Sequence, residues 1–296
     1  HTTCRRQRQM CIRDSFNIEQ LLVVVRRAME ASRLRQENFE LKRKDTPLSV
    51  MVGDSNIFKN FISNLDKVTK TQGRILLTGE SGSGKEMAAR YIHANSERAS
   101  KPFISVNCAS IAPDRMEDVL FGRDAGNSLP TDGLLSQADG GVIYFDEIAD
   151  MPLVTQSKIL RVLVDQKFQR VNGKSEVKVD LRVISSTSQD LREAIKQKSF
   201  REELYHRLNV VPINVPSLSQ RLEDIPLLFD HFAKNFHETQ GLNLRELSIE
   251  ASTMLQTMSW PGNIRQLKNI VERVLILGDG QEEVSIEDLP LETKLG

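Results

Sequence analysis

The chain has 296 residues, which is enough for one large domain or for two smaller domains that each bury a core. Its 40 basic and 40 acidic residues cancel, so the overall charge gives no indication of a nucleic-acid or membrane partner. The three cysteines have no metal-ligand spacing, and their odd number argues against a disulfide framework. No apolar run approaches the roughly 20 residues that span a bilayer and no secretory signal is visible, so we expect a cytoplasmic protein.

The N-terminal part divides into two segments. Residues 1–15 are rich in arginine and glutamine and lack hydrophobic periodicity, so we interpret them as non-native sequence. In residues 16–46, apolar side chains recur at steps of three and four, which predicts an amphipathic helix. The helix is either a solvated element or a signalling helix that pairs with a second copy, and its apolar seam is too short to decide.

Residues 47–216 alternate short apolar runs with helical patterns, which predicts an α/β domain with a parallel sheet flanked by helices. The expected strands are Arg74–Thr78, Phe103–Val106, Val142–Phe145, Leu181–Ser186 and Val210–Ile213. Leu153–Gln166 has the pattern of a helix, and Asn172-Gly173 after it indicates a hairpin.

Residues 217–296 carry helical patterns only, which predicts a small all-α domain. Its expected helices are Asp224–Glu238, Ser248–Met258 and Asn263–Leu277.

A glycine-rich stretch follows the first expected strand and precedes a helix. It consists of Gly79, Glu80, Ser81, Gly82, Ser83, Gly84, Lys85 and Glu86. In this context its backbone N–H groups and the helix N-terminus can hold phosphate oxygens, and Lys85 can reach the β- and γ-phosphates. Glu86 stands where most such loops have Ser or Thr, so the usual hydroxyl ligand for Mg²⁺ is absent.

Two acidic residues follow the apolar strand Val142–Phe145. In a parallel sheet this strand carries Asp146 and Glu147 to the carboxyl edge, where ligands bind. We expect Asp146 to hold Mg²⁺, directly or through water. We expect Glu147 to orient and deprotonate the water that attacks the γ-phosphate of ATP.

Longer motifs accompany these two sites. They are Ser105–Ala109, Leu120–Gly122, Ala138–Gly141, Phe200–Leu208 and Trp260–Leu267. Together they resemble the AAA+ ATPases that activate transcription with sigma-54 RNA polymerase, and within that family the NtrX-type nitrogen regulators. The likeness covers Val50 to about Pro290 and implies a AAA+ P-loop NTPase with a C-terminal helical lid. Glu86 matches the phosphate loop of this family.

The resemblance assigns roles to further residues. It implies that Asn107 restrains the catalytic Glu147 by a hydrogen bond, and that Arg265 touches the γ-phosphate from the lid. Val52 and Gly53 match the loop that holds the adenine.

Arg201 and Arg207 correspond to arginine fingers that enter the nucleotide site of a neighbouring subunit. From the residues alone they would be ion-pairing arginines on a helix face. If they act in trans, the resemblance implies a ring, which we expect to be a hexamer.

The sequence differs from the family pattern at two places that affect sigma-54 binding and ATP turnover. The family carries a Gly-Ala-Phe-Thr-Gly-Ala loop that grips the sigma-54 factor, whereas residues 123–133 here lack that motif and any aromatic side chain. The pair Thr187-Ser188 replaces the usual Thr-Asn, and the shorter serine predicts weaker water positioning and slow turnover.

The expected function is therefore an oligomeric ATPase module, with ATP and Mg²⁺ as cofactors, of a two-component transcription regulator. The alternative is a nucleotide-gated assembly switch in a DNA-binding regulator with little hydrolysis. Residues 16–21 resemble the last helix of a receiver domain, so a sensor kinase would act through a missing receiver. DNA would be bound through a missing C-terminal helix-turn-helix domain. Contact with RNA polymerase or a sigma factor is left open.

Overall fold

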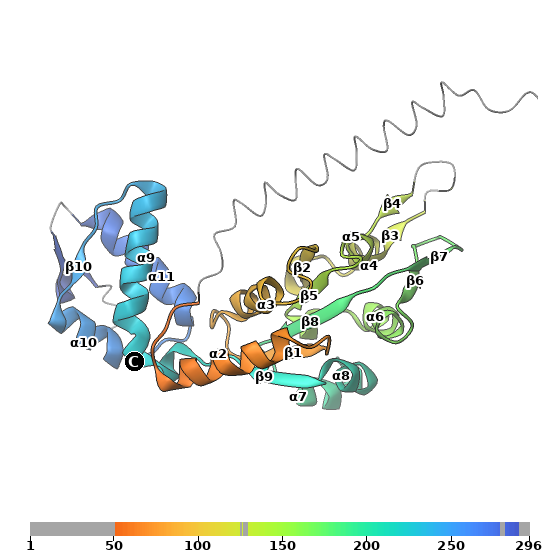
Figure 1. The fold of residues 1–296 in the computed structure, drawn as a ribbon, viewed down its shortest axis with the longest axis horizontal. Helices are drawn as coiled ribbons and strands as arrows, with labels where there is room; N and C mark the ends of the chain where they lie inside the picture. Colours follow the sequence, from red (N-terminus) through yellow and green to blue (C-terminus); the bar gives the residue numbers. More distant parts are fainter. Residues whose placement is uncertain (1–50, 125, 127–129, 279–281, 290–296) are drawn as a thin grey trace, which may run out of the picture. The chain divides into compact units, whose positions relative to one another are not determined.

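The computed structural model describes residues 51–124, 126, 130–278 and 282–289 (Figure 1). The predicted segments 1–15 and 16–46 lie outside these residues. Within the described ranges, no helix combines the length and the apolar character that crossing a bilayer requires.

Five strands form a parallel sheet in the order β2-β5-β8-β1-β9. They are β1 (Ile75–Thr78), β2 (Phe103–Asn107), β5 (Val142–Asp146), β8 (Arg182–Thr187) and β9 (Val211–Asn214). Each strand begins and ends within one residue of its predicted range, which confirms the α/β class. Because all five strands are parallel, their carboxyl ends meet at one edge of the sheet.

Alternate side chains of the strands face two layers of helices. In β1, Ile75 and Leu77 pack with α2 (Asn56–Thr69) and α3 (Lys85–Ala94). Leu76 belongs to the core on the other face. The helices contributing to that core include α4 (Met116–Phe121), α6 (Leu153–Asp165), α7 (Leu191–Lys196) and α8 (Glu202–Leu208). Burial on both faces explains why β1 and β5 are nearly continuous apolar runs in the sequence.

Two hairpins extend from this domain. Strands β6 (Lys167–Gln169) and β7 (Glu176–Lys178) are antiparallel, which confirms the hairpin predicted at Asn172-Gly173. Asn172 adopts a left-handed backbone with φ of 61° in the turn. Strands β3 (Gly122–Arg123) and β4 (Thr131–Asp132) form a second hairpin, which sequence periodicity missed because each strand has only two residues.

Short helices connect the larger elements. They are η1 (Cys108–Ser110), α5 (Leu134–Gln137), η2 (Ile148–Asp150), η3 (Leu218–Gln220), η4 (Leu222–Asp224) and η5 (Ile286–Asp288).

Three helices near the C-terminal end share a separate core, and Figure 1 shows α9 and α11 side by side. They are α9 (Ile225–Gln240), α10 (Ile249–Thr257) and α11 (Asn263–Leu277), each within two residues of its predicted range. Trp260 is 1% exposed in this core, and its indole N–H donates to Leu255 O at 3.1 Å.

The expectation of an all-α domain was incomplete, because β10 (Glu246–Leu247) pairs with β11 (Glu283–Val284) in parallel. The buried Arg245 holds this pair, donating to Glu283 O at 2.7 Å and to Asp288 Oδ2 at 2.9 Å.

Candidate functional site

The glycine-rich stretch forms a tight loop between β1 and the N-terminus of α3. Gly82 and Gly84 have φ of 77° and 103°, a left-handed conformation that favours glycine. A Cβ atom on Gly82 would lie 2.3 Å from Gly262 O, so the position also requires the absence of a side chain. Ser83 is 1% exposed, and its hydroxyl has no partner among the residues described, so a donor is available inside the loop.

Lys85 opens α3 and is 6% exposed. Its Nζ donates to Gly79 O at 2.9 Å and to Glu80 O at 3.2 Å, and it pairs with Glu147 Oε1 at 3.1 Å. The structure therefore brings the lysine of the loop and the second acid of the pair together at the carboxyl edge of the sheet.

Glu147 directly follows β5 and has a left-handed backbone with φ of 50°. Its Oε2 accepts hydrogen bonds from the backbone N–H and the hydroxyl of Ser188, each at 2.8 Å. Both carboxylate oxygens are thus held, one by Ser188 and the other by Lys85.

Asn107 contacts Asp146 rather than Glu147, so the contact implied by the resemblance is wrong for this structure. Its Nδ2 donates to Asp146 Oδ2 at 3.3 Å, and its Oδ1 caps η1 by accepting from two backbone amides. Asn107 and Asp146 are register partners at the ends of neighbouring strands. The left-handed turn at Glu147 directs the second acid instead toward Ser188, the residue that follows β8.

The other oxygen of Asp146 is held from within the sheet. Its Oδ1 accepts from Ser186 Oγ at 2.6 Å and from Tyr144 Oη at 2.9 Å. Burial raises the pKa of Tyr144, and the charge of Asp146 raises it further, so the phenol stays protonated. Burial raises the pKa of Cys108 to about 12, and the nearby charges of Asp146, Asp150 and Glu147 contribute.

Two residues at the start of α11 reach the glycine-rich loop. The buried Asn263 donates to Glu80 Oε2 at 2.9 Å and to Ser81 O at 3.1 Å. Its Oδ1 accepts from the backbone N–H of Leu218 at 2.7 Å. Arg265 Nη1 lies 3.3 Å from Ser81 Oγ. Sequence reasoning selected Arg265 but missed Asn263, whose only signal was its place in the Trp260–Leu267 motif.

The loop at Val52 and Gly53 is anchored on η4. Asp224 is 1% exposed, and its Oδ1 accepts from the backbone N–H of Asp54 at 2.7 Å. A Cβ atom on Gly53 would lie 2.6 Å from the Phe58 ring, so this close approach requires glycine. The guanidinium of Arg221 stacks on the same ring at 4.8 Å and donates to Val52 O at 3.4 Å. Burial lowers the pKa of Arg221, and Asp224 opposes that shift.

Arg201 and Arg207 are exposed and lie at the two ends of α8. No hydrogen bond or ion pair in the described part of the chain links either side chain to the glycine-rich loop. Arg74, which precedes β1, donates to Arg207 O at 3.5 Å, so Arg207 lies at the edge where β1 begins. Gly79 follows the opposite end of β1. It lies about 16 Å from Arg74, given the rise per residue of a strand.

Comparison with known proteins identifies the family. Residues 51–214 match the model of the sigma-54 interaction domain, and residues 219–295 match the AAA+ ATPase lid domain. The chain belongs to the sigma-54 interaction domain family.

Several relatives resemble this family member over most of its length. The nitrogen assimilation regulatory protein NtrX of Azorhizobium caulinodans is 48% identical over 282 residues, covering 94% of this chain and 62% of the relative. The transcriptional regulator NtrC of Salmonella typhimurium is 39% identical, covering 93% and 59%. A crystal structure of Brucella abortus NtrX in complex with ATP has 47% identity and a TM-score of 0.80, covering 95% and 62%. The chain thus spans about three fifths of these relatives.

The donor set of this sigma-54 interaction domain suits Mg²⁺ at Asp146. Mg²⁺ is bound by one or two carboxylates together with phosphates and water, so one acid at the sheet edge is sufficient. Asp146 Oδ2 has a single long bond from Asn107 and can serve as that ligand. Glu86 is paired with Arg90 at 2.7 Å on the surface of α3. No cluster of three or more His, Cys, Asp or Glu residues suited to a metal occurs in the described ranges.

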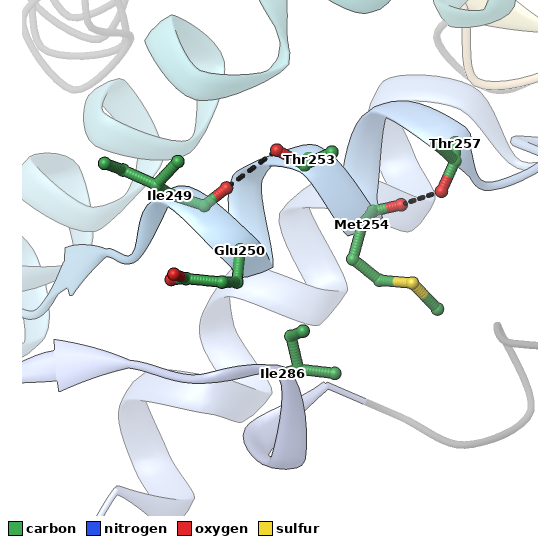
Figure 2. A pocket seen from close by; sticks show the side chains of 6 residues that line it. All are labelled: Ile249, Glu250, Thr253, Met254, Thr257 and Ile286. Atoms are coloured by element: carbon green, nitrogen blue, oxygen red, sulfur yellow. Dashed lines mark hydrogen bonds between the residues drawn. The ribbon is translucent and has the colours of Figure 1, made fainter.

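A shallow groove on the lid lies outside this site (Figure 2). It is lined by Ile249, Glu250, Thr253, Met254, Thr257 and Ile286, from α10 and η5. The hydroxyls of Thr253 and Thr257 donate to backbone carbonyls of their own helix at 2.9 and 2.8 Å. Since these donors are satisfied internally, the groove offers few polar contacts to a small ligand.

Proposed function

We propose that this chain binds ATP at the glycine-rich loop and hydrolyses it as part of an oligomeric transcription regulator. One observation carries the proposal: Lys85 of the loop lies 3.1 Å from Glu147 at the end of β5. A phosphate-binding lysine and a carboxylate that can act as general base are therefore in one place, at the edge where parallel sheets bind ligands.

ATP binding would rearrange this pair. The loop amides and the N-terminus of α3 hold the phosphates, and Lys85 exchanges its carbonyl and carboxylate partners for phosphate oxygens. That exchange releases Glu147 Oε1, which can then accept a proton from the attacking water. Loss of the lysine partner thus couples substrate binding to activation of the base.

Other site residues assist in this scheme. Mg²⁺ held near Asp146 would neutralise charge on the β- and γ-phosphates. Asn107 keeps the Asp146 side chain in place, and Arg265 moves from Ser81 to the γ-phosphate. Val52 and Gly53 hold the adenine, with Asp224 fixing the loop that contains them.

The arginines would act between copies. Arg207 lies about one strand length from the loop of its own chain, farther than a side chain reaches, so its charge is available to a neighbour. We propose that Arg207 and Arg201 stabilise the transition state in the adjacent copy. A closed ring, which we expect to be a hexamer, satisfies every site in this way.

The wider setting is also a proposal. One relative is named an NtrX-like response regulator and another a DNA-binding transcriptional regulator, which supports a role downstream of a sensor kinase and at DNA. By sequence position, residues 123–133 correspond to the family's gripping loop, and the connection from 124 to 130 contains no aromatic residue. We therefore expect no stable complex with sigma-54 even when a transition-state analogue is bound, and co-elution of the two would contradict this.

A nucleotide-gated assembly switch is the second candidate. It is favoured by the two hydrogen bonds from Ser188 to Glu147 Oε2, because they remain when Lys85 turns to phosphate. A carboxylate held in this way would bind water poorly and hydrolyse ATP slowly.

Steady-state phosphate release and nucleotide titration separate the two functions. We expect Lys85→Ala to lose ATP binding. We expect Glu147→Gln to bind ATP but to release phosphate about 100-fold more slowly than wild type. If wild type binds ATP but releases phosphate no faster than Glu147→Gln, the result supports the nucleotide-gated assembly switch and refutes the ATPase function. If wild type binds no adenine nucleotide, both proposals fail.

A further inference from the structure

A buried hydroxyl beneath the acidic pair connects the two acids. Ser186 Oγ donates to Asp146 Oδ1 at 2.6 Å and accepts a longer bond, 3.4 Å, from the backbone N–H of Glu147. Tyr144 Oη lies 2.8 Å from Ser186 Oγ and 2.9 Å from Asp146 Oδ1, so its one proton is shared between these two oxygens. The single proton and both lone pairs of the serine hydroxyl are then in use.

We infer that Ser186 and Tyr144 are positioning residues that fix the orientation of the Asp146 carboxylate for Mg²⁺. They hold Oδ1 from inside the sheet, which leaves Oδ2 as the oxygen that meets the metal or a water bound to it. The inference rests on the proposed nucleotide function, because Mg²⁺ would arrive with the nucleotide.

Burial supports a positioning role rather than direct contact with substrate. Ser186 and Tyr144 are each 0% exposed, so neither side chain is accessible to a nucleotide. A hydroxyl that donates to a carboxylate at 2.6 Å forms a short, charge-assisted bond, which restricts rotation of the acid. Groups in this second layer typically change metal affinity about 10- to 100-fold when removed.

The neighbouring Ser185 provides a matched control. It lies on the same strand, is also 0% exposed, and its hydroxyl has no hydrogen-bond partner among the described residues. Ser185→Ala and Ser186→Ala therefore delete the same atom from the same strand, but only the second removes a bond to Asp146.

The test measures Mn²⁺ binding to the ADP-loaded chain by electron paramagnetic resonance, and ADP affinity in EDTA by titration. We expect Ser186→Ala to weaken Mn²⁺ binding about 10-fold and Tyr144→Phe to weaken it by a smaller factor. ADP affinity in EDTA should stay within about twofold of wild type in both variants, and Ser185→Ala should match wild type.

Each outcome decides the inference separately from the proposed function. Unchanged Mn²⁺ binding in Ser186→Ala overturns it, as does an equal loss in Ser185→Ala. If Ser186→Ala fails to fold, Tyr144→Phe decides alone, because it keeps the ring and removes only the hydroxyl. Failure of wild type to bind ADP in EDTA would instead refute nucleotide binding itself.

Discussion

Replacing Asn263 tests whether the lid holds the phosphate loop. The side chain is 0% exposed and makes three hydrogen bonds, to Leu218, Glu80 and Ser81. Its removal leaves the amide of Leu218 buried without a partner, which costs about 1–3 kcal/mol. Loss of the two donated bonds adds about 1 kcal/mol each, so the free energy of unfolding should fall by about 3–5 kcal/mol.

Two variants distinguish the lost bonds from backbone strain. Asn263 has φ of 51°, where alanine costs about 1 kcal/mol and glycine does not. We therefore expect Asn263→Gly to lose the bond energies alone, and Asn263→Ala to be less stable by about a further 1 kcal/mol. In Asn263→Asp the acceptor for Leu218 remains, but a carboxylate faces Glu80, so nucleotide affinity should fall most in this variant.

The assay can use the single tryptophan, Trp260, which is buried three residues before Asn263 in the lid core. Urea unfolding followed by its fluorescence reports the stability of the lid, and ADP titration reports the state of the phosphate loop. If Asn263→Gly stays within about 1 kcal/mol of wild type and binds ADP equally well, the proposed coupling between the lid and the phosphate loop is refuted.

Three further outcomes are expected. Since the pKa of Cys108 is raised to about 12, its thiol stays protonated at pH 9, and alkylation in the native protein should be at least about 100-fold slower than in urea; equal rates would contradict this. Arg207→Ala and Glu147→Gln should each slow phosphate release by about 100-fold, whereas mixing them should restore part of it, because one copy supplies the arginine and the other the base; no recovery on mixing would argue against action in trans. Ser188→Ala removes one of the two hydrogen bonds to Glu147 Oε2. Because such a bond contributes about 1 kcal/mol, its loss should raise the steady-state turnover about fivefold; a slower variant would show that Ser188 assists catalysis.

The sequence was sufficient for the five-stranded sheet and the longer lid helices because these elements depend on local patterns. Apolar runs such as Val142–Phe145 are buried on both faces, so they stand out as strands without any knowledge of their neighbours. The glycine-rich loop and the pair Asp146–Glu147 could be placed at one edge because parallel strands end together.

The site contacts that sequence reasoning missed depend on residues far apart in the chain. Asn263 and Glu80 are 183 positions apart, and no periodicity links them. Asn107 was expected to hold Glu147, but the left-handed turn after Asp146 determines which acid it meets. Ser186 reaches Asp146 because β8 and β5 are neighbours, an order that the linear pattern does not reveal.

The placement of Arg207 at the far edge of the sheet has a consequence for control of the reaction. If Arg207 acts in trans as proposed, a single copy that has bound ATP lacks the guanidinium needed for hydrolysis, so its ATP stays uncleaved. ATP hydrolysis would then begin only when copies associate. At low protein concentration, the rate of hydrolysis should therefore rise more steeply than in proportion to the amount of protein.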